Sequence, residues 1–151
     1  MLDDLTAVQL YKVCAAREAV FVVEQDCAYQ ELDGMDFRAD HLIGWSQGEV
    51  AAYLRVLGPG TRFKEPSIGR VLTSKAFRGS GLGNVMIEQA VRHIEMRYPG
   101  QPMRLGAQAH LQRFYGAHGF VTVSGIYIED DIPHVEMLRS QARARGTRPS
   151  L

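Results

Sequence analysis

A glycine-rich run, Arg78-Gly-Ser-Gly-Leu-Gly83, is the clearest chemical feature of this sequence of 151 residues. It lies between an apolar segment typical of a strand and an amphipathic pattern typical of a helix. Such a turn can direct several backbone N–H groups toward one anion, and the dipole of the following helix adds positive potential. Glycines suit the task because a side chain would obstruct a phosphate and because tight turns need unusual φ angles. A flexible connection is the simpler alternative, since glycines commonly mark loops.

The spacing of these glycines excludes two familiar phosphate motifs. A dinucleotide fingerprint requires G-x-G-x-x-G, whereas Gly79, Gly81 and Gly83 give G-x-G-x-G and Asn84 stands at the last position. A P-loop requires a lysine directly after its final glycine, and no lysine follows Gly81 or Gly83. The repeated βαβ pattern of a dinucleotide fold is also missing. The turn therefore predicts an anion site of another kind.

A second motif begins 25 residues after Gly83 and reads Gln108-Ala-His-Leu-Gln-Arg-Phe-Tyr-Gly-Ala-His-Gly-Phe120. Together the two motifs resemble the GNAT acyltransferase superfamily. The first matches [RQ]-x-x-G-x-[GA] at Arg78, Gly81 and Gly83. The second resembles N-x-x-A-x-x-F-Y-x-x-x-G-F and matches it at Phe114, Tyr115, Gly119 and Phe120. It departs from that pattern where Gln108 replaces the asparagine and Leu111 the alanine.

The resemblance narrows to the ElaA-like branch of the superfamily and covers residues 5–139. Further segments similar to that branch are Phe21-Val-Val-Glu-Gln25, Tyr29-Gln30, Asp33, Gly69-Arg70-Val71, Gly106-Ala-Gln-Ala-His-Leu-Gln112 and Asp131-Ile-Pro-His134. Family members usually begin with a strand before the first helix. Here the numbering starts almost at that helix, so this strand is either absent or not represented.

The resemblance implies a site for acetyl-CoA, the acyl donor of the family. Its pantetheine arm is expected along the backbone of Val71, Leu72 and Thr73, where an N–H would also polarise the thioester carbonyl. Its pyrophosphate is expected on the amides of Arg78, Gly79, Ser80, Gly81, Leu82 and Gly83. The Arg78 side chain either adds charge there or is solvated. Gln108 is expected to replace the motif asparagine in binding the donor arm or the splayed strand.

Tyr115 is the first catalytic candidate that the resemblance implies. In the superfamily a tyrosine at this position donates a proton to the departing thiolate, and a phenol with an ordinary pKa of about 10 suits that task. A packing aromatic beside Phe114 is the alternative.

The general base has four candidates: Glu24, His110, Glu129 and His134. Glu24 follows the first helix, where the family builds the wall of its acceptor site. His110 lies at a helix start, where the dipole favours the neutral imidazole, and His134 is on the strand expected to face the acceptor. Each histidine is alternatively a hydrogen-bonded structural residue, and a water molecule can relay the proton instead.

Acidic residues concentrate in the two regions expected to flank the acceptor: Glu24, Asp33, Asp36, Glu129, Asp130 and Asp131. If these side chains converge, they favour a cationic amine before it is deprotonated. The expected partner is therefore a small-molecule amine or a peptide amine such as a lysine side chain. Solvated loop carboxylates are the alternative.

Hydrophobic periodicity predicts the elements that must position these residues. Helices are predicted at 6–23, 82–98 and 109–118, and strands at 41–46, 49–57, 67–74, 103–108, 120–128 and 132–138. The core face of the second helix is predicted to include Leu82, Val85, Met86, Ala90 and Ile94. The order indicates a single mixed α/β domain over 1–139, and residues 140–151 are expected to form a disordered tail. The resemblance implies the GNAT fold, a central sheet of six or seven strands with a splayed acyl-CoA groove and flanking helices.

Composition narrows the function classes. The 17 basic and 17 acidic residues balance, which gives no general reason to expect nucleic acid or an anionic membrane as a partner. The chain lacks an apolar run of about 18 residues and a recognisable signal peptide, so a cytoplasmic protein without a membrane span is expected. Cys14 and Cys27 show neither zinc-ligand spacing nor a disulfide framework, so no metal is expected.

The sequence is compatible with three functions. The first is an acetyl-CoA-dependent N-acetyltransferase that transfers directly to an amine, with Tyr115 as general acid. The second is a non-catalytic acyl-CoA-binding regulatory module that keeps the groove, and the third is a plain interaction domain. The paired motifs favour the first. A homodimer is a further expectation, because dimers are common among proteins of this type.

Overall fold

The computed structural model describes residues 1–141, and these residues form a mixed α/β structure around one seven-stranded sheet. The strands are β1 (Ala39–Ser46), β2 (Glu49–Leu57), β3 (Ser67–Thr73), β4 (Met103–Gln108), β5 (Val121–Thr122), β6 (Tyr127–Glu129) and β7 (Ile132–Arg139). Their order is β1-β2-β3-β4-β7-β5, and β6 also pairs with β7. The helices are α1 (Ala7–Glu18), α2 (Leu82–Arg97) and α3 (Gln112–Gly116). The predicted fold class is confirmed.

Short helical segments complete the described chain. Four are 3₁₀ helices: Leu2–Asp4, Met35–Arg38, Lys75–Phe77 and Ala109–Leu111. A π-helical segment, Ala19–Glu24, continues α1. The expected disordered tail falls almost entirely on 142–151, which lie outside the described residues, and the single domain over 1–139 stays a prediction.

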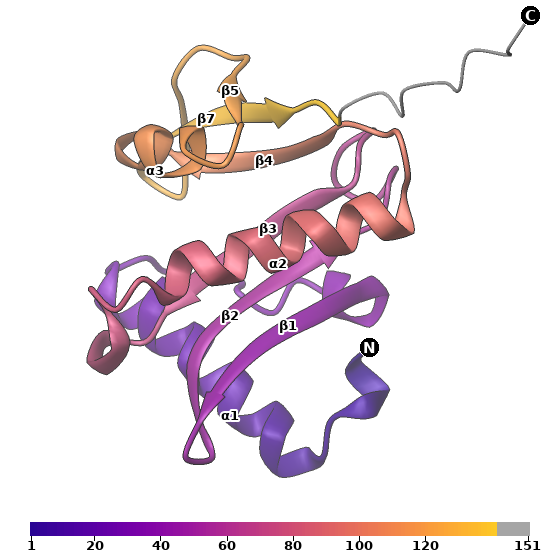
Figure 1. The fold of residues 1–151 in the computed structure, drawn as a ribbon. Coiled ribbons are helices and arrows are strands. Elements are labelled where there is room, and N and C mark those ends of the chain that lie inside the picture. The colour runs from indigo at the N-terminus through magenta and orange to yellow at the C-terminus, as the bar shows by residue number, and fades with distance from the viewer. Residues whose placement is uncertain (142–151) are drawn as a thin grey trace, which may run out of the picture.

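The helices α1 and α2 pack on opposite faces of β2 and β3 (Figure 1). Side chains alternate between the two faces of a strand, so neighbouring residues of β2 join different clusters. Tyr53 packs with Val13 of α1, whereas Leu54 belongs to the larger core that α2 covers. The sheet is therefore enclosed on both sides over its first three strands.

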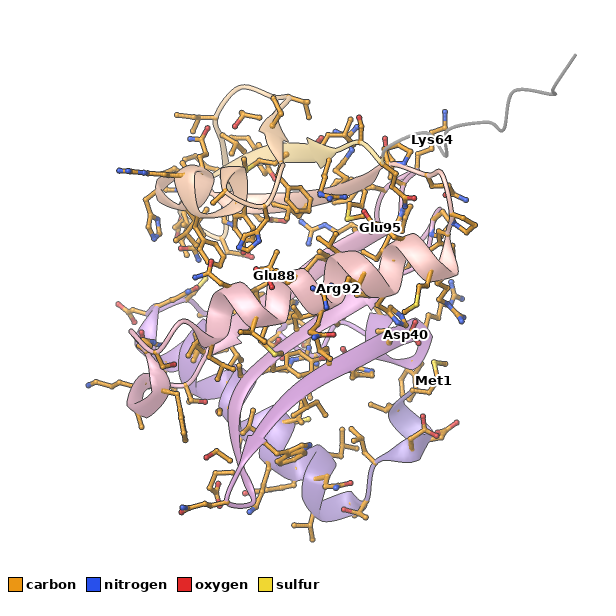
Figure 2. All side chains as sticks on the ribbon, in the orientation of Figure 1. Met1, Asp40, Lys64, Glu88, Arg92 and Glu95 are labelled. Carbon is orange, nitrogen blue, oxygen red and sulfur yellow. The ribbon has the colours of Figure 1, made fainter. Side chains whose placement is uncertain are left out.

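The buried face of α2 is rotated slightly from the predicted one. Its buried side chains are Met86, Ile87, Ala90, Val91 and Ile94, whereas Val85 is 50% exposed. With 3.6 residues per turn, Val85 lies about 140° around the helix from Ala90, so it cannot share that stripe. Figure 2 shows the polar outer face of α2, where Glu88, Arg92 and Glu95 are labelled.

The predicted strand at 120–128 is wrong as a continuous element. It divides into β5 and β6, and both pair with β7. Between them the Ser124 hydroxyl accepts the Glu136 amide at 2.8 Å, so a side chain replaces a backbone acceptor and the chain bulges outward. No helix of residues 1–141 is both long enough and apolar enough to cross a membrane.

The parallel strands β3 and β4 diverge almost as soon as they meet. Within residues 1–141 they share a single register pair, Ser67 with Arg104, and the Arg104 amide donates to the Pro66 carbonyl at 3.0 Å. The register between β2 and β3 shifts between Tyr53 and Arg55, opposite Arg70, whose φ is +52°. This bulge bends β3 away from β4. The middle of the sheet therefore opens into a gap.

Candidate active site

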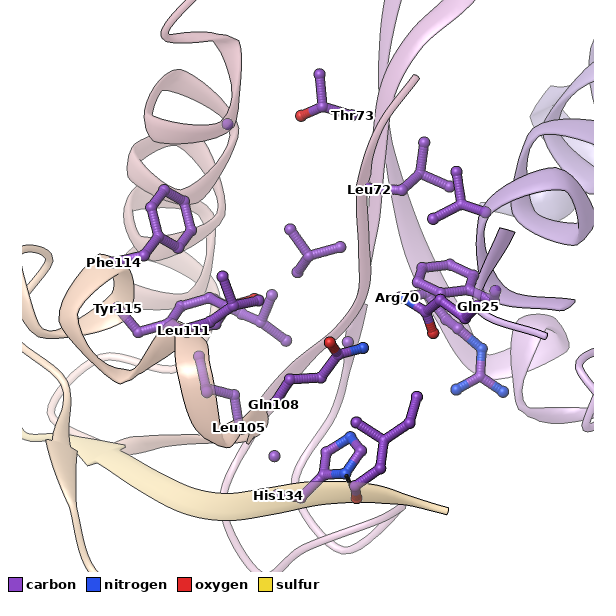
Figure 3. Close-up of a pocket in the computed structure, with 18 of the residues that line it drawn as sticks. Gln25, Arg70, Leu72, Thr73, Leu105, Gln108, Leu111, Phe114, Tyr115 and His134 are labelled. Carbon is purple, nitrogen blue, oxygen red and sulfur yellow. Dashed lines mark hydrogen bonds between the residues drawn. The ribbon is translucent and has the colours of Figure 1, made fainter. Parts of the chain in front are cut away.

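The gap between β3 and β4 is a groove of about 1000 Å³ (Figure 3). One wall is β3 from Ile68 to Thr73 with the segment after α1, and the other is β4 with the start of α3 and the β6–β7 turn. The glycine-rich turn and the N-terminus of α2 close one end. The structure thus places both sequence motifs on one cavity, and Val71, Leu72, Thr73, Gln108 and Tyr115 all line it.

The glycine-rich turn has the backbone that its sequence demands. Gly79 and Gly81 adopt φ values of +79° and +81°, and Gly81 is the N-cap of α2. A Cβ added at either position would meet no described atom within 4 Å, so the space beside the turn is open. Ser80 does not line the groove; its hydroxyl donates to the Phe77 carbonyl at 2.6 Å and closes the turn.

Arg78 and Glu24 form a bidentate ion pair across the glycine end of the groove. Arg78 Nη1 lies 2.5 Å from Glu24 Oε1, and Nη2 lies 2.9 Å from Oε2. The Arg78 Nε also donates to the Thr73 carbonyl at 3.0 Å. The hydrogen bond from Arg78 holds the pKa of Glu24 below its usual range. Both side chains are about half exposed and line the groove.

Tyr115 is buried in the wall of the groove, with 6% of its surface exposed. Its ring packs edge-on against Phe114 and Phe120, at centroid distances of 5.0 and 6.3 Å. Burial raises its pKa to about 12, so the phenol stays protonated at neutral pH. Within residues 1–141 its hydroxyl forms no hydrogen bond, yet it is not one of the fully buried polar atoms that lack a partner. The hydroxyl is therefore accessible from the groove that Tyr115 lines, where it can donate to a ligand.

Gln108 and His134 lie opposite each other on β4 and β7 and share one face of the sheet. Figure 3 shows both side chains in the groove. The His134 Nδ1 lies 2.7 Å from the Ile132 carbonyl, which can only accept, so Nδ1 carries the hydrogen. In the neutral ring Nε2 then holds a free lone pair. This Nε2 is 3.7 Å from Glu129 Oε2, and Tyr127 stacks on the ring at 5.9 Å.

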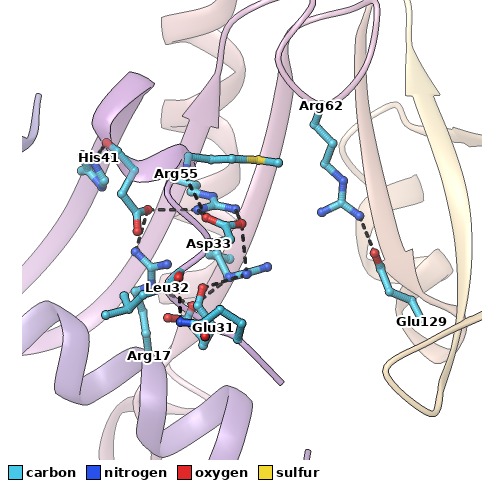
Figure 4. Close-up of polar contacts among 12 residues, drawn as sticks. Arg17, Glu31, Leu32, Asp33, His41, Arg55, Arg62 and Glu129 are labelled. Atoms are coloured by element: carbon cyan, nitrogen blue, oxygen red, sulfur yellow. Dashed lines mark hydrogen bonds and ion pairs between the residues drawn. The ribbon is translucent and has the colours of Figure 1, made fainter. Parts of the chain in front are cut away.

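The remaining predicted residues line the same cavity at other places. His110 is exposed in the 3₁₀ segment before α3 and lines the groove. Glu129 pairs with Arg62 of the β2–β3 loop at 2.8 Å (Figure 4). The Cys27 thiol donates to the Asp130 carbonyl at 3.2 Å, so the segment after α1 touches the β6–β7 turn.

Four of the six acidic residues do not offer free negative charge to the groove, and one of them is Glu129, which Arg62 binds as described above. Arg55 contacts both Asp33 Oδ2 and Asp36 Oδ1, at 2.6 and 3.0 Å (Figure 4). Arg17 binds Asp36 at 2.8 Å and Glu31 at 2.9 Å. Glu24 is neutralised by Arg78 as described above. The carboxylates on this side of the groove are therefore mainly partners of arginines. The negative charge that they leave to attract a cationic acceptor is smaller than their number implies.

The sequence did not predict that the arginines of this cluster are buried and bind carboxylates. Arg17 stands at a core position of the apolar pattern in α1, and Arg55 interrupts the apolar run of β2. Arg70 stacks over Tyr29 at 5.4 Å and binds Glu31 at 2.7 Å beside the bulge. An arginine at a buried position of a regular element needs a carboxylate partner, and that rule is the signal that could have found them.

These features fit the predicted acyl donor. The edge of β3 that faces the groove is unpaired in the described chain beyond Ser67, so its backbone is free for the amides of a pantetheine arm. The open glycine turn at the N-terminus of α2 suits a pyrophosphate.

Comparison with known proteins supports the same conclusion. A family model described as an acetyltransferase (GNAT) domain matches residues 2–140. The protein ElaA of Escherichia coli strain K12 is 42% identical over 144 residues, which cover 94% of this chain and 94% of ElaA.

Solved structures of other proteins share this fold. The crystal structure of an acyl-CoA N-acyltransferase from Pseudomonas aeruginosa superposes with a TM-score of 0.86 and 48% identity, and covers 92% of this chain and 95% of its own. A GNAT family acetyltransferase from Elizabethkingia anophelis, with acetyl-CoA bound, has a TM-score of 0.60 over 76% of this chain and 84% of its own. Its 11% identity shows the fold alone.

A cytoplasmic location and a homodimer stay predictions. The family match over nearly the whole chain, the close relatives and the divided sheet agree: this chain belongs to the GNAT acetyltransferases, enzymes that take their acyl group from acetyl-CoA.

Proposed function

We propose that this protein is an N-acetyltransferase that moves an acetyl group directly from acetyl-CoA to an amine, with Tyr115 as general acid and His134 as general base. The observation that carries the proposal is Tyr115, whose ring is buried in the wall of the groove while its hydroxyl stays accessible and forms no hydrogen bond within residues 1–141. Its pKa of about 12 keeps the phenol protonated at neutral pH, so it can donate to the sulfur as negative charge develops there.

At the donor end the backbone does most of the binding. Acetyl-CoA supplies an acetyl group activated as a thioester. The Ser74 amide donates to the Ala51 carbonyl at 2.9 Å, so strand alternation turns the Thr73 amide toward the groove. Such an N–H can bind the pantetheine arm, and one beside it can polarise the thioester carbonyl. The amides of the glycine turn are proposed to hold the pyrophosphate.

Two side chains account for the protons in the proposed step: one accepts a proton and the other donates one. The bond between the amine nitrogen and the acetyl carbon forms as the carbon–sulfur bond breaks. His134 Nε2 accepts the proton that the amine loses, and Tyr115 gives its proton to the sulfur. The fixed tautomer of His134 supports this assignment, because it leaves the Nε2 lone pair free. By contrast, Glu24 is engaged by Arg78 at the glycine end of the groove.

Direct transfer is favoured over a covalent acyl-enzyme by the state of Cys27, whose thiol lines the groove. Burial raises the pKa of this thiol, and the carboxylates of Asp130 and Asp131 raise it further. A nucleophilic cysteine needs the opposite environment, one that stabilises the thiolate. Cys27 therefore stays a thiol and donates a hydrogen bond to the β6–β7 turn.

The acceptor is proposed to be an amine that arrives protonated, either a small molecule or the lysine side chain of a peptide. Glu129 Oε2 and His134 Nε2 lie 3.7 Å apart, and in the neutral histidine both are acceptors. An ammonium group between them would donate to both, and it loses its first proton to bulk water before the attack, so that His134 is free to take the second. Arg62 binds Glu129 through Oε1, so the proposed acceptor site uses the other oxygen of this carboxylate together with His134.

Replacing Tyr115 with phenylalanine tests the proposal. The Tyr115→Phe variant is expected to lose about 10²-fold or more in kcat, because the leaving thiolate lacks its acid, while the Kd for CoA stays within about twofold. Turnover is measured as CoA release with a panel of polyamines, amino-acid derivatives and lysine peptides. The matched control is Tyr98→Phe, a tyrosine that does not line the groove. An unchanged kcat in Tyr115→Phe would remove Tyr115 from the chemistry. CoA binding without turnover of any amine would point to a regulatory binding module instead.

A further inference from the structure

The donor end of the groove contains its own anion, the carboxylate of Glu24. This residue is the last of the π-helical segment that extends α1, and it reaches the glycine-rich turn more than fifty residues away along the chain. Its two oxygens occupy both terminal nitrogens of Arg78, at 2.5 and 2.9 Å. A guanidinium fork filled by one carboxylate in this way cannot offer the same geometry to a phosphate.

The Nε–H of Arg78 is occupied too, so of its five N–H groups only the second hydrogen on each terminal nitrogen has no partner within residues 1–141. Its Nε donates to the carbonyl of Thr73, the last residue of β3. The arginine of the glycine motif is therefore tied to β3 on one side and to Glu24 on the other. Its positive charge is neutralised at the place where the phosphates of a donor are expected, and the backbone amides of Gly79 and Gly81 are left to bind them.

We propose that Glu24 sets the affinity of the groove for CoA by holding the guanidinium of Arg78 and by placing a negative charge beside the pyrophosphate site. The affinity is thereby kept low enough for the CoA product to leave. Glu24 acts through Arg78, so it is a positioning residue and not a catalytic one. The inference rests on acetyl-CoA as the donor and is independent of the roles proposed for Tyr115 and His134.

The sign of the effect follows from charge alone. Removing the Glu24 carboxylate exposes the positive charges of Arg78 and of nearby Lys75, the two residues that act on its carboxylate electrostatically. CoA is a polyanion, so its binding strengthens. Removing Arg78 alone leaves an unpaired carboxylate in the groove, and CoA binding weakens. Removing both charges restores a neutral site, with an affinity near that of the wild type.

The first experiment measures the Kd for CoA by calorimetry, with no acceptor and no turnover. Glu24→Gln is expected to lower the Kd about threefold to tenfold at about 50 mM salt, and the gain should shrink at about 500 mM salt. The matched control is Glu49→Gln, which removes a carboxylate from an exposed ion pair with Lys12 outside the groove. Its Kd should equal that of the wild type. In steady state Glu24→Gln should lower the KM for acetyl-CoA more than it changes the chemical step.

The double-mutant cycle completes the test. Arg78→Gln should raise the Kd, and Glu24→Gln combined with Arg78→Gln should return it to within about twofold of the wild type. A Kd that is unchanged or higher in Glu24→Gln overturns the proposal, as does a gain that persists at high salt. Melting curves of each variant confirm folding, which is expected because both side chains are exposed at the surface of the groove. Because CoA binding is the readout, a failure of the catalytic assignments would leave this result intact.

Discussion

Gly81 and Gly60 share a backbone conformation but differ in what lies beside them. Their φ values are +81° and +79°, and a Cβ at either would meet no described atom within 4 Å. Neither glycine is therefore required by protein packing. Gly81 is the N-cap of α2 and lines the groove, whereas Gly60 lies in the β2–β3 loop and does not line it. Substitutions at these two glycines therefore distinguish a loss of stability caused by backbone strain from a loss of ligand affinity.

Alanine at these two positions should have equal effects on stability and unequal effects on binding. Gly81→Ala and Gly60→Ala should each lower the free energy of unfolding by about 1–2 kcal/mol, because an L-residue is strained at positive φ. Only Gly81→Ala should weaken CoA binding, by about tenfold or more, since its methyl group enters the space for the phosphates. Urea denaturation and calorimetry measure the two quantities. Equal Kd values in both variants would show that the phosphates lie elsewhere.

The sequence indicated a role for some single residues and not for others, and the difference has a physical reason. Tyr115, Gly81 and His134 stand in local motifs, so their types and spacing could be interpreted without a structure. The role of Glu24 could not, because its partner Arg78 is distant in the chain and only the fold brings them together. A motif gives the chemistry that a residue can perform, whereas an ion pair decides whether the residue is free to perform it.

At the scale of elements, the segment between α1 and β1 is held mainly by buried charge. It contains one short 3₁₀ helix, Met35–Arg38, and its carboxylates bind arginines from α1, β2 and β3. Burial opposes ionisation of Asp33, but hydrogen bonds from Arg55 and the Met35 amide hold its pKa below the ordinary value. Burial likewise opposes ionisation of Asp36, and Arg17 and Arg55 lower its pKa. The wall of the groove that includes Asp33 and Arg70 depends on this cluster.

Removing one arginine of the cluster should be costly. Arg55→Met is expected to lower the free energy of unfolding by about 3–5 kcal/mol, because Asp33 keeps only its longer contact with Arg70 and the buried Asp36 keeps only Arg17. The control Lys12→Met breaks an exposed pair and should cost less than about 1 kcal/mol.

The same cluster predicts that the stability of the protein falls as the pH is lowered. The folded-state pKa values of Asp33 and Asp36 are depressed, so their stabilisation is complete above the unfolded value of about 4 and is lost as the pH falls toward the folded values. The wild type should lose stability steadily below about pH 4 in urea denaturation, and Arg55→Met should show a flatter profile. An identical acid slope in both proteins would contradict this account.

Periodicity predicted the elements well where apolar stripes decide the structure. The limits of α2 and β4 agree closely with the sequence, because their buried faces repeat at regular spacing. The break between β5 and β6 was missed because tertiary hydrogen bonds accompany it, from the Glu136 amide to the Ser124 hydroxyl and from the Val123 amide to the Glu136 carbonyl. The burial of Arg17 and Arg55 was missed because a charged residue in an apolar pattern does not reveal its partner.

At the scale of the whole molecule, the sheet consists of two parts joined at the Ser67–Arg104 pair. The first part, β1 to β3, carries α1 and the arginine cluster, and the second, β4 to β7, carries Gln108 and His134. Periodicity cannot reveal this division, because it reports which strands form and not how they pair. Only the resemblance to a family implied that the sheet splays.

The divided sheet has a consequence for hydrogen exchange. Amides at the centre of a sheet normally exchange slowest, because their bonds break only when the protein opens widely. Here the Thr73 amide points into the groove, so in the ligand-free protein it should exchange with deuterium much faster than the amides of neighbouring β2. CoA should slow that exchange, and residue-resolved measurement in D₂O with and without CoA reports the change. If Thr73 is already as protected as β2 without a ligand, the strand edge is not free. Otherwise a poorly protected strand edge lies at the centre of the sheet, where the donor is proposed to pair with it.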